Sequence, residues 1–278
     1  MRKIVLAASL ALAAAASAPS ALASASVKHP ESVGFSFEGV FGTFDRNQLK
    51  RGFQVYKEVC SSCHSLSLVA YRNLKDPGGP EFTEAEAKAL AAEVEIPILD
   101  DAGQPATRKG TLADHFPYQT QPDQKATLKS AYGLLPPDLS LVAKGREGGA
   151  DYIHALLTGY GEEPPHGMTM PEGGNYNPYF PGGVIAMPPP IVDGQVEYAE
   201  KDVPRTVDQY AKDVAAFLMW AAEPKLEARH RLGFGVLLFL GILTGLLYLS
   251  YRRGWRDVEH WADVARATLW NGGLRAAV

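Results

Sequence analysis

Two cysteines three residues apart, followed directly by a histidine, constrain this chain more than any other feature. They are Cys60, Cys63 and His64, in the sequence Cys-Ser-Ser-Cys-His. On one turn of helix, the two thiols lie on the same face, where they can form thioethers with the two vinyl groups of a haem. The imidazole that follows then points at the iron. The motif therefore predicts one covalently attached haem c with His64 as an axial ligand.

The N-terminus carries an export signal. Arg2 and Lys3 precede an apolar run that ends in small residues, which is typical of a secretory signal peptide and predicts cleavage near residue 25. Removal of residues 1–25 takes the net charge from −4 to −6, because Arg2 and Lys3 are the charged residues lost. The mature chain has no basic stripe suited to nucleic acid, so a nucleic-acid partner is not expected.

A second apolar segment predicts a membrane anchor. Residues 232–250 form a run of 19 residues without a charge, and at about 1.5 Å per residue this run crosses most of a roughly 30 Å hydrocarbon layer. Charged and aromatic residues flank it on both sides. We expect a haem domain over residues 26–228, a transmembrane anchor over 229–251 and a tail over 252–278. The signal peptide orients the anchor in a bacterial inner membrane, with the haem domain in the periplasm and the tail in the cytoplasm.

A zinc site or a redox dithiol accounts for the cysteine motif less well than a haem does. A zinc site would need two further ligands at short spacing, and the chain has no other cysteine. A dithiol oxidoreductase or cytochrome-assembly factor does not require the histidine after the second cysteine, although it stays open as a rival. In an exported chain, two uncoupled thiols would also be free to oxidise to a disulfide.

Helical patterns occupy only part of the exported region, which is long enough for one domain. A helix capped by Asp45 leads into the haem motif, and the last helix before the anchor should pack on it. The other expected elements are helices over 84–94, 150–158 and 207–222, a loop region over 97–127, and ordered coil around a cofactor over 159–192.

The second axial ligand has several candidates by residue chemistry. Met187 is the preferred candidate, because three prolines follow it and Gly182 and Gly183 precede it, which fixes the backbone without crowding a weak thioether ligand. Methionine opposite histidine raises the reduction potential and favours electron transfer. The alternatives that stay open are Met168, Met170, His154 and His166, whereas Met219 is expected to pack on its helix.

An acidic segment could guide a basic partner to the haem. Residues 81–101 hold seven carboxylates against Lys88 alone. The carboxylates belong to Glu81, Glu84, Glu86, Glu93, Glu95, Asp100 and Asp101. Such a segment would speed association in a salt-dependent way, and an ordinary solvated helix face is the alternative.

Several longer motifs carry a family resemblance. They are RGFQVY at 51–56, LPPDLS at 135–140, LLTGY at 156–160, NPYFPGG at 177–183, AMPPP at 186–190 and WAAEP at 220–224. Together with the haem motif, they resemble the cytochrome c1 family, the membrane-anchored haem subunits of ubiquinol–cytochrome c oxidoreductase, the bc1 complex. The similarity runs from about Phe35 to Tyr251.

The resemblance implies a mainly α fold, in which a class I cytochrome c-like haem domain with long loop insertions is followed by one C-terminal transmembrane helix. It also implies that Met187 is the sixth ligand, and that Arg146 and Tyr152 contact a haem propionate. Some relatives carry an additional cysteine pair near the haem, which this sequence lacks.

The resemblance further implies a relay of electrons. Such a subunit is not an enzyme by itself: it takes one electron from the Rieske iron–sulfur protein and passes it to a soluble cytochrome c, in a complex that contains cytochrome b. The alternative is another membrane-anchored c-type cytochrome with an open iron, acting as a peroxidase or a gas sensor.

Overall fold

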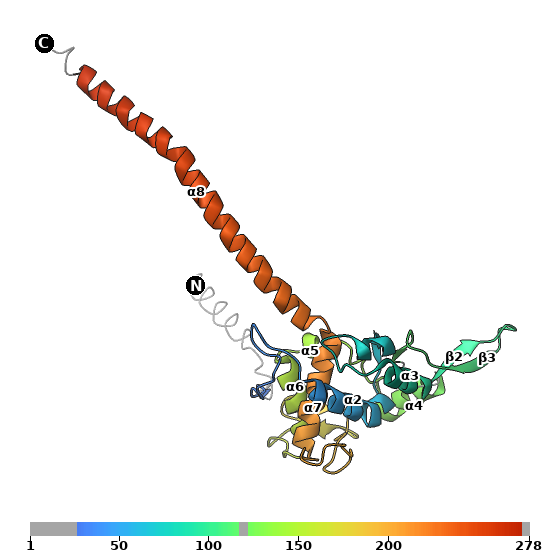
Figure 1. Cartoon of the computed structure of the whole chain (residues 1–278). Helices are drawn as coiled ribbons and strands as arrows, with labels where there is room; N and C mark the ends of the chain where they lie inside the picture. Colours follow the sequence, from blue (N-terminus) through green and yellow to red (C-terminus); the bar gives the residue numbers. More distant parts are fainter. Residues whose placement is uncertain (1–26, 117–121, 274–278) are drawn as a thin grey trace, which may run out of the picture. The chain divides into compact units, whose positions relative to one another are not determined.

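The computed structural model describes residues 27–116 and 122–273 (Figure 1). The signal peptide predicted for residues 1–25 lies outside the described residues. The chain divides into two compact units: one comprises residues 27–36 and 44–224, and the other comprises Phe37–Thr43 and the chain from Lys225 onward. The first unit contains the haem motif, and the second contains the apolar helix.

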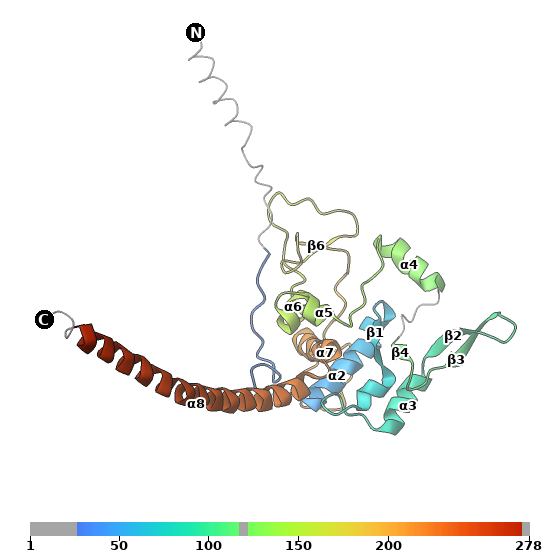
Figure 2. The same ribbon diagram turned by 90° about the horizontal axis from the view of Figure 1, so that it is seen from above.

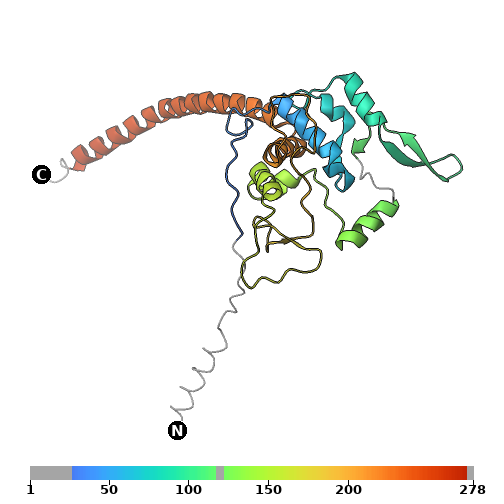
Figure 3. The ribbon, with the colours of Figure 1, turned by 90° about the horizontal axis from the view of Figure 1, so that it is seen from below.

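Three helices form the centre of the first unit. They are α2 (Arg46–Glu58), α6 (Gly149–Thr158) and α7 (Val207–Ala222). Seen from above and from below, α7 lies between α2 and α6 (Figures 2 and 3). The predicted packing of the last helix of this unit on the first is therefore confirmed.

Helix α2 begins where its sequence predicts. The Asp45 carboxylate accepts hydrogen bonds from the backbone N–H groups of Asn47 (2.9 Å) and Gln48 (3.1 Å), which would otherwise have no partner at the helix start. The cap therefore fixes the first residue of the helix that carries the haem motif at its other end.

The crossing of α2 and α7 depends on a glycine. A Cβ atom on Gly52 would lie 2.1 Å from the backbone oxygen of Asp213, so the two helices approach as closely as backbones allow. Aromatic rings fill the space beside the crossing: the ring centroid of Phe217 is 5.7 Å from that of Phe53 and 5.8 Å from that of Tyr56. Such ring pairs stabilise the folded state by more than the burial of their apolar area alone provides.

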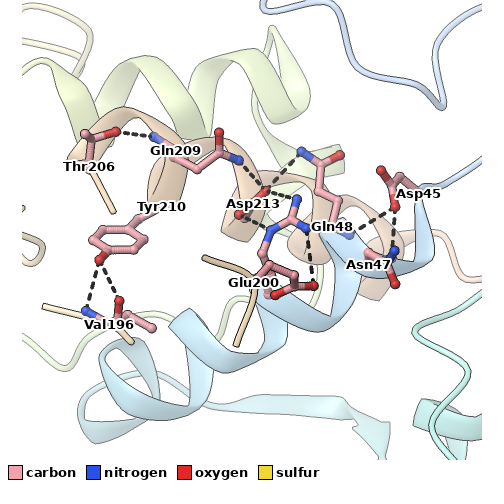
Figure 4. Close-up of polar contacts among 10 residues, drawn as sticks. Asp45, Asn47, Gln48, Val196, Glu200, Thr206, Gln209, Tyr210 and Asp213 are labelled. Carbon is pink, nitrogen blue, oxygen red and sulfur yellow. Dashed lines mark hydrogen bonds and ion pairs between the residues drawn. The ribbon is translucent and has the colours of Figure 1, made fainter. Parts of the chain in front are cut away.

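A buried polar cluster joins the same two helices (Figure 4). The Asp213 side chain is fully buried and accepts hydrogen bonds from Arg51 Nε (2.9 Å), Gln48 Nε2 (3.2 Å) and Gln209 Nε2 (2.9 Å). Burial lowers the pKa of Arg51, but the hydrogen bond to Asp213 and the charge of that carboxylate outweigh it and leave the pKa raised. The Arg51 guanidinium therefore stays positively charged at every physiological pH.

The remaining elements of the first unit are short. They are η1 (Cys60–Ser62), β1 (Leu66–Ala70), η2 (Tyr71–Lys75), α3 (Glu84–Ala92), β4 (His115–Phe116), α5 (Val142–Gly145), β5 (Asn175–Tyr176) and β6 (Val184–Ile185). β1 pairs antiparallel with β4, and β5 with β6. The helices expected over 84–94 and 150–158 are thus present as α3 and α6, and residues 159–192 are coil apart from two residues in each of β5 and β6.

The expected loop over residues 97–127 is wrong in part. β2 (Glu95–Leu99) and β3 (Pro105–Lys109) form an antiparallel hairpin that projects from the helices (Figure 1), and α4 (Pro122–Tyr132) follows. The Asp100 carboxylate closes the turn by accepting from the N–H groups of Ala102 (2.9 Å) and Gln104 (2.8 Å), and Gly103 supplies a positive φ of 74°. This is a turn with a recognisable sequence signal, which flanking prolines and polar residues obscured.

The second unit is dominated by α8 (Leu226–Gly273). Within it, Leu226–Arg256 is long and apolar enough to cross a membrane, and its most apolar window is entirely exposed. The anchor predicted for residues 229–251 lies inside this candidate span. The helix continues through most of the predicted tail.

Candidate haem site

The cysteine motif forms one tight turn at the end of α2. The backbone N–H groups of Cys63 (3.1 Å) and His64 (2.8 Å) both donate to the carbonyl oxygen of Cys60. The Ser61 hydroxyl donates to the carbonyl oxygen of Lys57 (2.7 Å), which fastens the turn to the last turn of α2. The two thiols and the imidazole therefore share one turn, as the sequence predicted.

The imidazole of His64 is oriented from a distant loop. Its Nδ1 lies 2.7 Å from the carbonyl oxygen of Pro137, which can only accept, so Nδ1 carries the proton and Nε2 is left with a free lone pair. Burial lowers the pKa of His64, which favours the neutral ring. A neutral imidazole with its second nitrogen held by a carbonyl is the form that binds iron. The donor chemistry of the turn thus fits a covalently held haem.

The loop that holds His64 is itself fixed by Asp138. Its carboxylate accepts hydrogen bonds from the Ser65 hydroxyl (2.5 Å) and from the N–H groups of Ser67 (2.8 Å) and Ser140 (2.9 Å). Burial opposes ionisation of Asp138, but these hydrogen bonds outweigh it and lower its pKa to about 2. Sequence reasoning missed Asp138, although it lies in the LPPDLS motif.

Met187 is carried by a segment that is tied to α6. The fully buried Asn177 donates from its amide nitrogen to the carbonyl oxygen of Leu156 (2.8 Å) in α6. Its backbone N–H donates to Gly183 (2.9 Å), at the start of the short path through β6 to Met187. The Tyr160 hydroxyl then donates to the carbonyl oxygen of Met187 itself (3.0 Å). The position of this half-buried methionine is therefore set from two sides.

Tyr152 lies in the first turn of α6, and Arg146 directly follows α5, three residues before α6 begins. Tyr152 is buried, and burial raises its pKa while the positive charge of Arg146 lowers it, so the two side chains are electrostatic neighbours. Arg146 is exposed. The hydroxyl of Tyr152 also influences Tyr160, whose pKa burial raises. A guanidinium and phenol hydroxyls so placed are suited to partly desolvated carboxylates.

The described contacts gather the predicted residues into two groups. Cys60, Cys63 and His64 belong to the turn after α2. Arg146 at the end of α5, Tyr152 in α6 and Met187 in the coil tied to α6 form the second group. Among the described residues, no hydrogen bond or ion pair joins one group directly to the other. The two groups are connected through the packed helices, because α2 packs on α7 and α7 packs on α6 (Figure 2).

The alternative axial ligands are engaged elsewhere or less constrained. Nε2 of His154 lies 2.9 Å from the Asp208 carboxylate at the start of α7. Met168 places its terminal methyl group against Gly183, and His166 is exposed. The geometry therefore favours Met187 over these residues.

The thiol environment argues against a dithiol enzyme. Burial, with the neighbouring Cys63 as a smaller cause, raises the pKa of Cys60 to about 12. Redox-active thiols need the opposite, a pKa lowered by positive charge or a helix N-terminus. The arrangement is better suited to sulfurs held as haem thioethers than to a reactive thiolate.

The acidic segment is less free than its sequence indicates. Its carboxylates form ion pairs with basic side chains, most of which lie outside the segment in the sequence. The pairs are Glu93 with Lys57 (2.6 Å), Glu84 with Lys75 (3.2 Å) and Lys88 (2.8 Å), and Glu81 with Arg46 (2.9 Å). The local excess of negative charge is therefore smaller than seven carboxylates against one lysine.

Comparisons with known proteins show which family the chain resembles over most of its length. The Cytochrome C1 family profile matches residues 35–258. "Cytochrome c1" of Rhodospirillum rubrum is 47% identical over 242 residues, which cover 81% of this chain and 87% of that protein. "Cytochrome b-c1 complex catalytic subunit, mitochondrial" of Candida albicans is 47% identical over 235 residues (84% and 79%). "Cytochrome b/c1" of Bradyrhizobium diazoefficiens is 47% identical over 242 residues, but this chain spans only 35% of its length.

Proposed function

Because the chain belongs to the cytochrome c1 family, electron transfer in a bc1 complex is its role, and we propose that it takes one electron from a Rieske iron–sulfur protein and passes it to a soluble cytochrome c. The family carries one covalent haem c, which supplies a one-electron couple when bound. The protein's own residues have to attach this group, ligate it and set its potential.

The proposed attachment uses the turn after α2. Cys60 and Cys63 form the thioethers, and His64 provides one axial nitrogen through Nε2. The observation that carries the proposal is the 2.7 Å contact of His64 Nδ1 with the Pro137 carbonyl, because it leaves Nε2 as the free ligand atom. Tyr56 adds to this positioning, since its hydroxyl donates to the His64 carbonyl (3.0 Å).

Met187 is proposed as the opposite ligand. A thioether binds iron weakly, so the backbone must hold it in place, and the hydrogen bond from Tyr160 together with Pro188–Pro190 supplies that restraint. Arg146 and Tyr152 are proposed to offset the propionate charges, which also raises the potential by disfavouring the oxidised, more positive iron.

The second unit is proposed to anchor the protein beside its partners. Bacterial relatives and the candidate span of α8 support membrane anchoring. The name "Cytochrome b/c1" of one relative supports cytochrome b as a partner. The orientation, with the haem domain in the periplasm and the C-terminus in the cytoplasm, follows from the predicted signal peptide.

Met187→Leu tests the proposal, with Met168→Leu as a matched control in the neighbouring coil. In the full-length holoprotein, Met187→Leu should lower the midpoint potential steeply, remove the charge-transfer band of methionine-ligated ferric haem and allow carbon monoxide to bind the ferrous iron. Met168→Leu should change none of these. An unchanged potential in Met187→Leu, or carbon monoxide binding by the wild type, would reject methionine ligation and favour an open-iron cytochrome.

A further inference from the structure

A four-residue turn in the second unit exposes two apolar side chains at its tip. The backbone N–H of Gly42 donates to the carbonyl oxygen of Gly39 (3.3 Å), which places Val40 and Phe41 at the two central positions. The Val40 residue is 68% exposed, and Phe41 is 79% exposed. Exposure of a phenylalanine to water is unfavourable, so covering these two side chains with an apolar surface would be favourable.

The backbone of this turn is built for its shape. Gly39 adopts a φ of 77°, which residues other than glycine rarely adopt. A Cβ atom on Gly42 would lie 2.2 Å from the backbone carbon and oxygen of Phe37. Two glycines are therefore required to fold the turn so tightly. The protrusion of Val40 and Phe41 is a feature of a defined turn.

The turn lies against the start of the candidate membrane span. The ring of Phe41 packs on that of Phe234, with 6.2 Å between the centroids. Phe234 is the third residue of the charge-free run that begins at Leu232, which puts it about 3 Å into the run at 1.5 Å per residue. This depth corresponds to the membrane interface, where aromatic side chains are favoured.

We propose that the turn at residues 39–42 is a second membrane contact, which inserts Val40 and Phe41 into the lipid interface beside the span. A lipid surface is the occupant that the contacts favour, because the ring of Phe41 continues the apolar surface of α8 and that surface requires lipid. The neighbouring Glu38 is exposed and keeps the base of the turn at the water side. This inference rests on the proposal that α8 spans the membrane.

The contact would restrain the haem-bearing part of the chain. Only three residues separate Gly42 from Arg46, the first residue of α2, and α2 runs directly into the haem motif. A span alone attaches the protein at one end of residues 44–224. The turn would attach it at the other end as well, close in sequence to the haem.

Spin labelling of the full-length holoprotein in nanodiscs of phosphatidylcholine and phosphatidylglycerol tests the inference. A nitroxide on Val40→Cys keeps Phe41 in place. In the holoprotein, Cys60 and Cys63 are bound to the haem as thioethers, so they do not react with the label. Leu68→Cys is the matched control, because Leu68 is an apolar residue of β1 that is 61% exposed. Ile242→Cys, near the middle of the charge-free run, reports separately on the span.

The ratio of oxygen accessibility to accessibility for a water-soluble nickel chelate measures depth. We expect this ratio to be several-fold higher for the label at position 40 than for that at 68, and highest at 242. Adding Phe41→Asp to Val40→Cys should return the ratio to that of position 68. A label at 40 that matches 68, or that is shielded from both reagents as in a protein interface, would overturn the inference. A water-exposed label at 242 would instead overturn the span.

Discussion

The buried carboxylate of Asp213 should be indispensable for the packing of α7 on α2, and Asp213→Asn tests this. In the structure, four N–H donors point at its two oxygens: Nε and Nη2 of Arg51, and the side-chain amides of Gln48 and Gln209 (Figure 4). An asparagine of the same shape would replace one oxygen with a donor. The new amide NH2 group would then face one of these N–H donors and could not accept from it. The Arg51 guanidinium would also lose its counter-charge.

The size of the effect follows from burial. Removing one partner of a buried ion pair costs about 3–5 kcal/mol of unfolding free energy. We expect about 3 kcal/mol here, because the Arg51 side chain keeps 13% exposure and a longer contact to Glu200 (3.9 Å). With a urea m-value of about 3 kcal/mol/M, the unfolding midpoint should fall by about 1 M.

Urea unfolding of the full-length holoprotein in detergent, followed by haem absorbance, measures this loss. Asp208→Asn is the control on the same helix, since the Asp208 side chain is 75% exposed and its pairing with His154 should contribute less than about 1 kcal/mol. Adding Arg51→Gln to Asp213→Asn should restore part of the stability by removing the unpaired charge. Equal losses for the two asparagine variants, or no recovery in the double variant, would refute the reasoning.

Three further predictions concern other parts of the chain. Gly52→Ala should destabilise the holoprotein by about 3 kcal/mol, because the new Cβ meets α7 backbone at 2.1 Å, whereas Gly145→Ala meets nothing within 4 Å and should be near neutral in the same urea assay. Asp138→Asn should be less stable than wild type at neutral pH. Since the folded pKa of Asp138 is about 2, that difference should shrink as the pH falls from about 4 to 2, and a pH-independent difference would contradict it. A reporter enzyme active only in the periplasm should work when fused near Pro224 and fail after Val278, and the reverse would invert the proposed topology.

The helices could be predicted because their signals are local. Asp45 caps α2 through the two N–H groups that follow it, and Thr83 and Glu86 form a reciprocal capping box at the start of α3. The apolar face of α7 likewise follows from the spacing of apolar residues along that one helix. Each of these predictions depends on residues within one or two turns of one another.

The two errors have different causes, one local and one that involves residues distant in the sequence. The β2–β3 hairpin depends on a turn signal at Asp100 and Gly103 that a polar, proline-containing context obscured. The acidic segment was overestimated because Lys57 and Lys75, outside it in the sequence, pair with Glu93 and Glu84. Charge counted along a chain ignores ion pairs that only folding creates.

The candidate site combines both kinds of information. Covalent attachment needs only the five residues of the motif, so sequence suffices to identify it. The orientation of His64 depends on Pro137, which is 73 residues away, and the position of Met187 depends on Tyr160, 27 residues away. The motif therefore specifies that a haem is bound, whereas the loops that fix its axial ligands are what would set its potential. A chain could keep the first property and lose the second, so spectra and potentials test this fold more sharply than haem content does.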